Sequence, residues 1–549
     1  METQQEEKEF NLLYEPWILV KTRKNETKEW SLLEVFQHAH EAQQLAGELP
    51  TQDMAIMRLL LAIMHGAFVT SDVENADDAK DLWKELWAMK QFPYGIIERY
   101  LKQYEDRFWL FHPEYPFYQV ADIVDVMNGY KKAKGKKTKD EEKLKPVARL
   151  IGELFQSDNA PRLFSARNGE QKCALDYAES VRWLLHLNGF DDDSAKNPTP
   201  KGVGFLGQLG LIYAQGENLF ETLMLNFVLV NNNNKLFDDG KEAAKAYWEK
   251  PVCKTVENLI SQPTAQKDLL TMQSRRILLK RESGKIIGYL LTMGDYFDKE
   301  QGLFNEQMTL WKTDEKKGFV PNRHSPERQI WRDFSSLIST GGTNSNNRDS
   351  GVIHWLQVLQ DNSIIPADIV RVCIIGIYYK LKGAGWQAVD FVNDSLQVNS
   401  SIFRTLGTIW VDEIVRILSL TDKAIFALGW LAIDIATAEG DSSKDHTGIG
   451  REAREQGYNH LDKAFRKWML SVDPQKDNDN MEIKMKEWVE IAKKTIFIQG
   501  EQILDHCSDK AIVGFMKKVK DKNMNEKIEN INGLKAFIKF QSGVNQVLG

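Results

Sequence analysis

The chain has 549 residues, of which 42% are hydrophobic and 15 are Trp, and its formal net charge is −7. This length predicts about two to four domains with sizeable cores, and the composition excludes a disordered chain. The acidic balance gives no support for nucleic-acid binding through bulk charge, so such binding requires local basic patches. Four cysteines without a CxxC pair argue against a zinc ribbon or a disulfide framework, and they predict a reduced, cytoplasmic environment. The acidic start does not resemble a signal peptide, and no apolar run reaches the roughly 18 residues that span a bilayer.

The first hundred residues combine β-like runs with helices. Residues 11–20 are typical of a strand with a proline step, and Ser31 followed by Glu34 is typical of a capped helix start. The nearly continuous apolar run at 54–68 predicts a buried helix. Residues 81–104 have the amphipathic period of a single helical segment.

A lysine-rich stretch occupies residues 128–146, where few apolar residues occur. Its eight lysines are Lys131, Lys132, Lys134, Lys136, Lys137, Lys139, Lys143 and Lys145. We expect an exposed, mobile loop, and such a charge run is usually a solvated linker. The alternative is an arm that follows DNA or RNA, because clustered lysines neutralise phosphates without reading sequence. Lys134, Lys136 and Lys137 are the candidate phosphate contacts.

Polar loops punctuate the middle of the chain. Residues 157–169, 191–209 and 340–351 are rich in Gly, Asn, Asp, Ser or Pro and predict loops. Helices are expected at 175–187 and, strongly apolar, at 219–230. These loops carry Asn, Arg, Lys and aromatic residues, which fit contacts to bases or phosphates, although most such loops are plain connections.

The last third of the chain changes to a helical period. Two β-like runs within 269–320 predict a small antiparallel sheet, and from about residue 400 onward apolar residues recur as in amphipathic helices. Four such helices with short polar joints predict an antiparallel bundle, the first over 402–437. We therefore predict an α+β, mostly helical fold, with a large mixed domain over 1–385 and a C-terminal four-helix bundle over 386–549.

Motifs of catalysis are missing from the sequence. It contains no GxxxxGK[ST] phosphate loop, no HExxH motif and no His-Asp dipeptide, and its ten histidines are scattered. We therefore predict no catalytic residues, no metal and no cofactor. A metal-dependent nuclease assembled from dispersed carboxylates stays open as an alternative.

Several segments, in order, resemble the CasA family, the large subunit of type I-E CRISPR Cascade complexes. The opening NLL and WI at 11–18 are similar to the start of that family, and HPEYPFYQ, ETLMLN and WEKP resemble three of its later segments. The matching segments continue with LTMQSRR at 270–276, PER and WRD within 326–333, and the Gly341-Gly342 pair before an Asn-rich loop. Their shared order over most of the chain identifies the resemblance.

This resemblance implies a DNA-reading scaffold without an active site. In such complexes a guide RNA pairs with the target strand, while this subunit reads a short flanking motif on double-stranded DNA. It also helps to open the duplex and recruits a separate helicase–nuclease. The implied partners are the guide RNA, the target duplex, the other Cascade subunits and that nuclease, with no membrane. Some relatives carry paired cysteines for zinc; only Cys173 and Cys253 fall in comparable regions here, so we predict no zinc.

The family's DNA-facing loops can be placed on this sequence. Its glycine loop falls at Lys201, Gly202, Val203 and Gly204, and its strand-separating wedge falls at Asn346, Asn347, Arg348 and Asp349. Relatives carry a Gln near the wedge tip, whereas Asn347 or Arg348 stands here, in a loop one residue longer. The family's groove-reading lysine aligns within 307–312, best with Gln307, and this departure puts the lysine's role in question.

The family's RNA-proximal loop falls at residues 162–168. Its candidate residues are Arg162, Leu163, Phe164, Ser165 and Arg167. An aromatic side chain such as Phe164 can stack on a base, and flanking arginines can hold phosphates. A protein-only scaffold that touches no nucleic acid remains the second alternative function.

Overall fold

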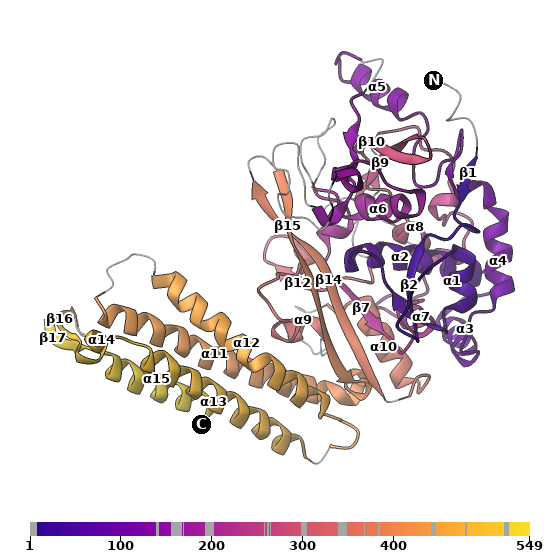
Figure 1. Cartoon of the computed structure of the whole chain (residues 1–549). Coiled ribbons are helices and arrows are strands. Elements are labelled where there is room, and N and C mark those ends of the chain that lie inside the picture. Colours follow the sequence, from indigo (N-terminus) through magenta and orange to yellow (C-terminus); the bar gives the residue numbers. More distant parts are fainter. Residues whose placement is uncertain are drawn as a thin grey trace. The chain divides into compact units, whose positions relative to one another are not determined.

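The computed structural model divides the chain into two compact units, shown in Figure 1. The mixed unit comprises Met1–Pro326, Ser345–Ile364 and Arg371–Ser395, and the helical unit comprises Glu327–Asn344, Ile365–Val370 and Leu396–Gly549. The structure describes residues 8–138, 142–154, 167, 169–192, 202–256, 259–260, 263, 265–297, 305–338, 348–366, 368–382, 385–440, 446–477, 480–520 and 526–549. The domain boundary predicted at 385/386 falls at the start of a strand, Gly385–Asn399.

Small sheets dominate the strand content of the mixed unit. Its strands are β1 (Glu9–Asn11), β2 (Ile18–Thr22), β3 (Thr27–Trp30), β4 (Ala42–Leu45), β5 (Trp109–Phe111), β6 (Lys145–Pro146), β7 (Leu211–Gln215), β8 (Leu259–Ile260), β9 (Arg275–Glu282), β10 (Lys285–Met293), β11 (Tyr296–Phe297), β12 (Trp311–Asp314), β13 (Gly318–Pro321) and most of β14 (Ile369–Lys382) and β15 (Gly385–Asn399). They form sheets in the orders β3-β2-β4, β1-β5, β6-β10-β9, β15-β14-β7, β12-β13 and β11-β8. The β9–β10 hairpin confirms the antiparallel sheet predicted within 269–320.

The helices of the mixed unit pack around one central helix. They are α1 (Leu32–His38), α2 (Pro50–Phe68), α3 (Ala76–Ala88), α4 (Tyr94–Gln103), α5 (Ile123–Ala133), α6 (Tyr177–Phe190), α7 (Leu219–Asn226), α8 (Gln266–Leu270) and α10 (Gly351–Asp361). Helix α2 is buried at nearly every position and packs against α4, α6, α7 and α8, as expected for a helix that is apolar all round. Ser31 and Glu34 form the predicted capping box of α1.

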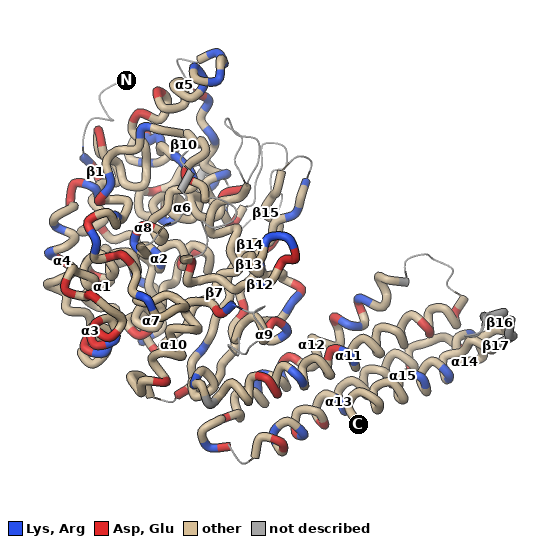
Figure 2. Tube along the Cα trace, turned by 180° about the vertical axis from the view of Figure 1, so that it is seen from behind, with Lys and Arg blue, Asp and Glu red and all other residues tan. Residues whose placement is uncertain are grey.

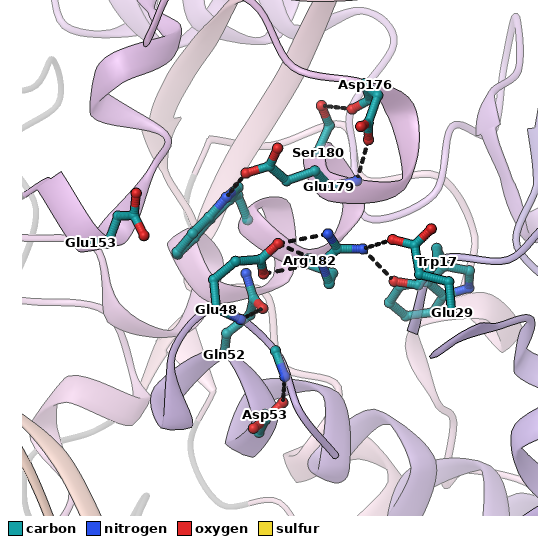
Figure 3. Close-up of polar contacts among 12 residues, drawn as sticks. Trp17, Glu29, Glu48, Gln52, Asp53, Glu153, Asp176, Glu179, Ser180 and Arg182 are labelled. Atoms are coloured by element: carbon teal, nitrogen blue, oxygen red, sulfur yellow. Dashed lines mark hydrogen bonds and ion pairs between the residues drawn. The ribbon is translucent and has the colours of Figure 1, made fainter. Parts of the chain in front are cut away.

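Arg182 on α6 fastens this helix to the start of the chain, as Figure 3 shows. Its guanidinium donates hydrogen bonds to both carboxylate oxygens of Glu48, to Glu29 Oε1 at 2.7 Å and to the carbonyl of Trp17 at 2.8 Å. Glu29 lies on β3 and Glu48 directly precedes α2. A single buried cation therefore joins α6 to the β3-β2-β4 sheet and to the start of the central helix.

Asp53 lies in the first turn of α2, close to the same cluster (Figure 3). Its Oδ1 accepts a hydrogen bond from the backbone N–H of Gly47 at 2.8 Å. Burial raises the pKa of the Asp53 carboxyl to about 7, because the Gly47 bond offsets only part of the cost of removing the charge from water. The nearby carboxylate of Glu48 acts in the same direction as burial. Asp53 is therefore a candidate for pH-dependent stability.

The helical unit is built on four long helices. It contains α9 (Phe334–Leu337), α11 (Thr408–Ala438), α12 (His446–Leu470), α13 (Met481–Asp505), α14 (Asp509–Val513), the hairpin β16 (Phe515–Lys520) and β17 (Glu526–Ile531), and α15 (Gly533–Leu548). Helix α11 packs against α12, α13 and α15, and α13 packs against α12 and α15. The four long helices predicted at the C-terminal end are therefore present and pack together.

An aromatic cluster explains why residues 327–338 belong to the helical unit. The ring of Trp331 stacks on Phe465 with centroids 4.9 Å apart, and its indole N–H donates to Asp462 at 2.9 Å. Phe465 in turn contacts Trp488 edge-on at 5.1 Å. Buried aromatic pairs of this kind contribute about 0.5–1.5 kcal/mol beyond their buried area.

Four sequence-based element predictions need correction. The single helix expected over 81–104 is two helices, because Pro93 separates α3 from α4. The helix expected over 219–230 ends at Asn226, and that expected over 402–437 begins at Thr408. The exposed loop expected over 128–146 starts as helix α5, in which Lys131 is buried and paired with Glu142. The predicted α+β, mostly helical fold class is confirmed.

Candidate nucleic-acid interface

The glycine loop is held tightly from its inner side. Gly202 has a φ of +116°, a conformation that side chains other than glycine adopt only with strain. A Cβ on Gly204 would lie 2.4 Å from the carbonyl oxygen of Gly189, so no side chain fits there. Val203 between them is buried. The backbone of Gly202 is thus the partly exposed part of this loop, whereas Lys201 lies outside the described residues.

Gln307 has a buried side chain, not a groove-facing one. It is 3% exposed, and its Nε2 donates to the carbonyl of Asn305 at 2.7 Å. Its own carbonyl accepts hydrogen bonds from the hydroxyl of Ser350 at 2.9 Å and from the N–H of Val352 at 3.1 Å. In this conformation Gln307 supports the wedge loop through its backbone. The exposed cation of the same segment is Lys312, on β12.

The base of the wedge loop is fixed by three further contacts. The carbonyl of Asp349 accepts a hydrogen bond from Asn232 at 2.9 Å. The guanidinium of Arg348 lies over the ring of Trp311, 4.2 Å from its centroid, and burial lowers the pKa of Arg348 to about 10. Arg348 therefore keeps its charge at neutral pH. Asn346 and Asn347, at the predicted tip, lie outside the described residues.

Buried polar contacts connect the glycine loop with the wedge base. Arg58 on α2 forms a two-pronged ion pair with Glu306, at 2.9 and 3.0 Å, with side chains that are 2% and 1% exposed. The same guanidinium lies 5.5 Å from the ring centroid of Phe205, which directly follows the glycine loop. Glu306 precedes Gln307, whose carbonyl holds Ser350. The structure thus brings the three predicted DNA-facing elements onto one connected framework.

The RNA-proximal loop is described only at one of its candidate residues. Arg167 pairs with Glu153 and with Glu179 of α6, the latter at 2.6 Å, and Figure 3 shows both carboxylates. A phosphate would have to compete with these two carboxylates for the guanidinium. Arg162, Leu163, Phe164 and Ser165 lie outside the described residues, so their roles stay predictions.

The lysines proposed as phosphate contacts lie just beyond α5. Lys134, Lys136 and Lys137 are exposed, and Figure 2 shows basic residues gathered at this end of the helix. Lys134 lies 6.0 Å from the ring centroid of Tyr130. The three ammonium groups are placed where a nucleic-acid backbone has access to them.

Two absences bear on function. Across the part of the chain that the structure describes, no group of three or more His, Cys, Asp or Glu side chains is placed to hold a metal ion. No helix within those same ranges is long and apolar enough to cross a membrane.

Several residues of this framework escaped the sequence-based prediction. Arg58, Glu306 and Arg275, which contacts the glycine loop, lie far apart in the sequence and match no motif of known chemistry. The sequence signal that includes one of them is the LTMQSRR segment, which resembles the family and contains Arg275. A pair of opposite charges 248 residues apart gives no local pattern.

The two-unit fold is that of CRISPR-associated proteins. The crystal structure of Thermobifida fusca Cse1 superimposes with a TM-score of 0.77 at 26% identity and covers 98% of both chains. A chain of a CRISPR RNA-guided surveillance complex shares the fold with a TM-score of 0.63 at 16% identity, over 90% of this chain and 99% of that one.

Sequence comparison gives the family. The model of the CRISPR-associated protein Cse1 matches residues 11–497, and the chain therefore belongs to the Cse1 family, also called CasA. The CasA/Cse1 protein of Thermus thermophilus is 29% identical over 344 residues, a match that spans 61% of each chain. The predicted family resemblance is confirmed.

Proposed function

We propose that this chain is the noncatalytic large subunit of a type I-E RNA-guided CRISPR complex, which reads the flanking motif on double-stranded DNA and helps to open the duplex. The observation that carries this proposal is the connected framework described above. It joins the glycine loop, the Gln307 segment and the base of the wedge loop through Phe205, Arg58 and Glu306. A flanking motif must be read and the adjacent base pair opened at one place, so these elements need a common support.

The glycine loop suits close approach to a DNA groove. Without a side chain on Gly202, the backbone can approach base edges and sugars. The minor groove offers few distinguishing groups, so readout through a backbone is degenerate. A buried Gln307 where relatives carry a lysine supports a looser motif preference, with Lys312 as the exposed cation of that segment.

The wedge loop suits insertion between strands. Its base is anchored at Ser350, Asp349 and Arg348, which leaves the preceding Asn-rich residues to act at the strand junction. The guide RNA, the other subunits and the recruited helicase–nuclease follow as partners from family membership. The chain of a CRISPR RNA-guided surveillance complex with the same fold supports this assignment.

The decisive experiment compares the assembled complex with and without this subunit on duplexes that carry different flanking motifs. We expect tight, motif-dependent capture only with the subunit present. Asn347→Ala combined with Arg348→Ala should weaken capture of closed duplexes, by about 1–3 kcal/mol per lost polar contact, and spare targets opened beforehand as bubbles. Arg416→Ala, an exposed change on α11, is the control. Equal loss on both substrates would contradict the wedge assignment.

The same material distinguishes the alternative functions. Cleavage of plasmid by the purified chain with Mg²⁺ or Mn²⁺ would establish a metal-dependent nuclease and overturn the proposal. Binding of DNA by the complex that is unchanged when the subunit is omitted would favour a protein-only scaffold.

A further inference from the structure

We propose that Arg275 is a positioning residue that fixes the backbone of the glycine loop and thereby sets how strongly the complex discriminates between flanking motifs. This inference rests on the proposed function and adds a determinant of specificity that does not itself contact DNA.

Arg275 is the first residue of β9 and is 3% exposed. All three nitrogens of its guanidinium donate to neighbouring atoms. The Nε donates to the carboxylate of Asp191, the Nη1 to the carbonyl of Ser274 at 2.8 Å, and the Nη2 to the carbonyls of Asp192 at 3.2 Å and Gly202 at 3.0 Å. A planar, rigid guanidinium that is held on several sides fixes the direction of the Gly202 carbonyl.

The rest of the loop is held by the neighbours of Arg275. The N–H of Gly204 donates to the carbonyl of Asp191 at 2.7 Å. The N–H of Phe205 donates to the hydroxyl of Ser274 at 3.2 Å. Three backbone contacts within four residues therefore connect the glycine loop to the end of α6 and the start of β9. Since Gly202 has a positive φ, its backbone has wide conformational freedom unless such contacts restrict it.

Loss of this restraint should change specificity more than affinity. Contacts to phosphates provide most of the affinity for DNA and are the same for every sequence, whereas contacts to base edges distinguish sequences. A glycine loop with a free backbone would still allow phosphate contacts elsewhere on the complex. It would lose the fixed geometry on which motif readout depends.

Arg276 provides a matched control in the adjacent position. It is 1% exposed, and successive side chains of a strand point to opposite faces. Its guanidinium pairs with Asp295 and donates to the carbonyls of Gln273 and Thr255, none of which belongs to the glycine loop. Replacing either arginine by Lys keeps the charge and removes the fork of donors.

The experiment measures Kd of the assembled complex for duplexes with a preferred and a disfavoured flanking motif. Arg275→Lys should lower the ratio of the two Kd values by roughly 5–10-fold, through weaker binding of the preferred duplex alone, in line with the loss of one readout contact. Arg276→Lys should leave the ratio unchanged. Ser274→Ala, which removes the hydroxyl contact to Phe205 and leaves Arg275 in place, should give a smaller decrease in the same direction.

Hydrogen exchange of the peptide that covers residues 202–208 provides a second readout, independent of DNA. We expect faster exchange in Arg275→Lys than in Arg276→Lys and the wild type. A ratio and an exchange rate like those of the wild type in Arg275→Lys would overturn the inference, as would equal changes in both variants. If the wild-type complex shows no motif preference, the proposed function fails, and exchange alone then decides whether Arg275 holds the loop.

Discussion

Replacing Asp53 by Asn should stabilise the mixed unit at neutral and alkaline pH and leave it unchanged near pH 4. Burial raises the pKa of Asp53 from 3.8 to about 7, so the folded protein retains a proton in a range where the unfolded chain has released it. Between these two values the folded state binds more protons, and the free energy of unfolding therefore falls as pH rises. At about 1.4 kcal/mol per pH unit, the roughly three units amount to at most about 4 kcal/mol above pH 7.

Asn should reproduce the neutral carboxyl and still accept the N–H of Gly47. The difference in unfolding free energy between Asp53→Asn and the wild type should be close to zero at pH 4, grow through pH 5–7 and level off above. His186, a buried histidine whose pKa burial lowers to about 3, changes stability in the opposite direction as pH rises, but it cancels in this difference.

Hydrogen exchange of peptides from α2, corrected for intrinsic rates at each pH, is the appropriate assay because it reports on the mixed unit alone. Asp81→Asn, at an exposed position of α3, is the matched control and should show no such pH dependence. A stability difference that is constant from pH 4 to pH 8 would refute the reasoning, since it would mean that Asp53 titrates alike in the folded and unfolded chains.

Three further predictions concern the framework and the basic segment. Gly351→Ala places a Cβ 1.6 Å from the side-chain oxygen of Gln307, so it should weaken capture of closed duplexes, whereas Gly95→Ala, with nothing within 4 Å, should not. Arg58→Met should destabilise the mixed unit by about 3–5 kcal/mol by exchange of α2 amides, and adding Glu306→Leu should recover part of this loss; further loss in the double variant would contradict a coupled pair. Glutamine at the three candidate lysines should reduce the salt dependence of DNA binding by up to about 0.9 in log–log slope per phosphate contact, and superimposed lines would favour a solvated linker. The three lysines are Lys134, Lys136 and Lys137, and the charge-matched controls are Lys84, Lys423 and Lys463.

The elements that the sequence predicts well are those with a local physical cause. Helix α2 follows from a continuous apolar run, the capping box from Ser31 and Glu34 at the required spacing, and the β9–β10 hairpin from two β-like runs around a short turn. The prediction for Lys131 was wrong, because its partner Glu142 lies beyond the end of the helix and a charge run alone predicts exposure.

The framework beneath the candidate site could not be predicted in the same way. Family resemblance located the loops, but the contacts that support them join residues far apart in the chain, such as Arg58 with Glu306 and Arg275 with Gly202. Tertiary packing decides these partners. Gln307 illustrates the difference, since alignment placed it at the groove-reading position and the structure buries its side chain against Gly351.

The division into units has a consequence for synthesis of the protein on the ribosome. The chain passes from one unit to the other at 326/327, 344/345, 364/365, 370/371 and 395/396. Trp331, part of the aromatic cluster of the helical unit, is therefore translated long before Phe465 and Trp488, its neighbours in that cluster. At about 5–20 residues per second, this indole waits for many seconds without them. Nascent chains should consequently need protection from premature association over this interval, and a chain truncated near residue 385 should expose Trp331 permanently.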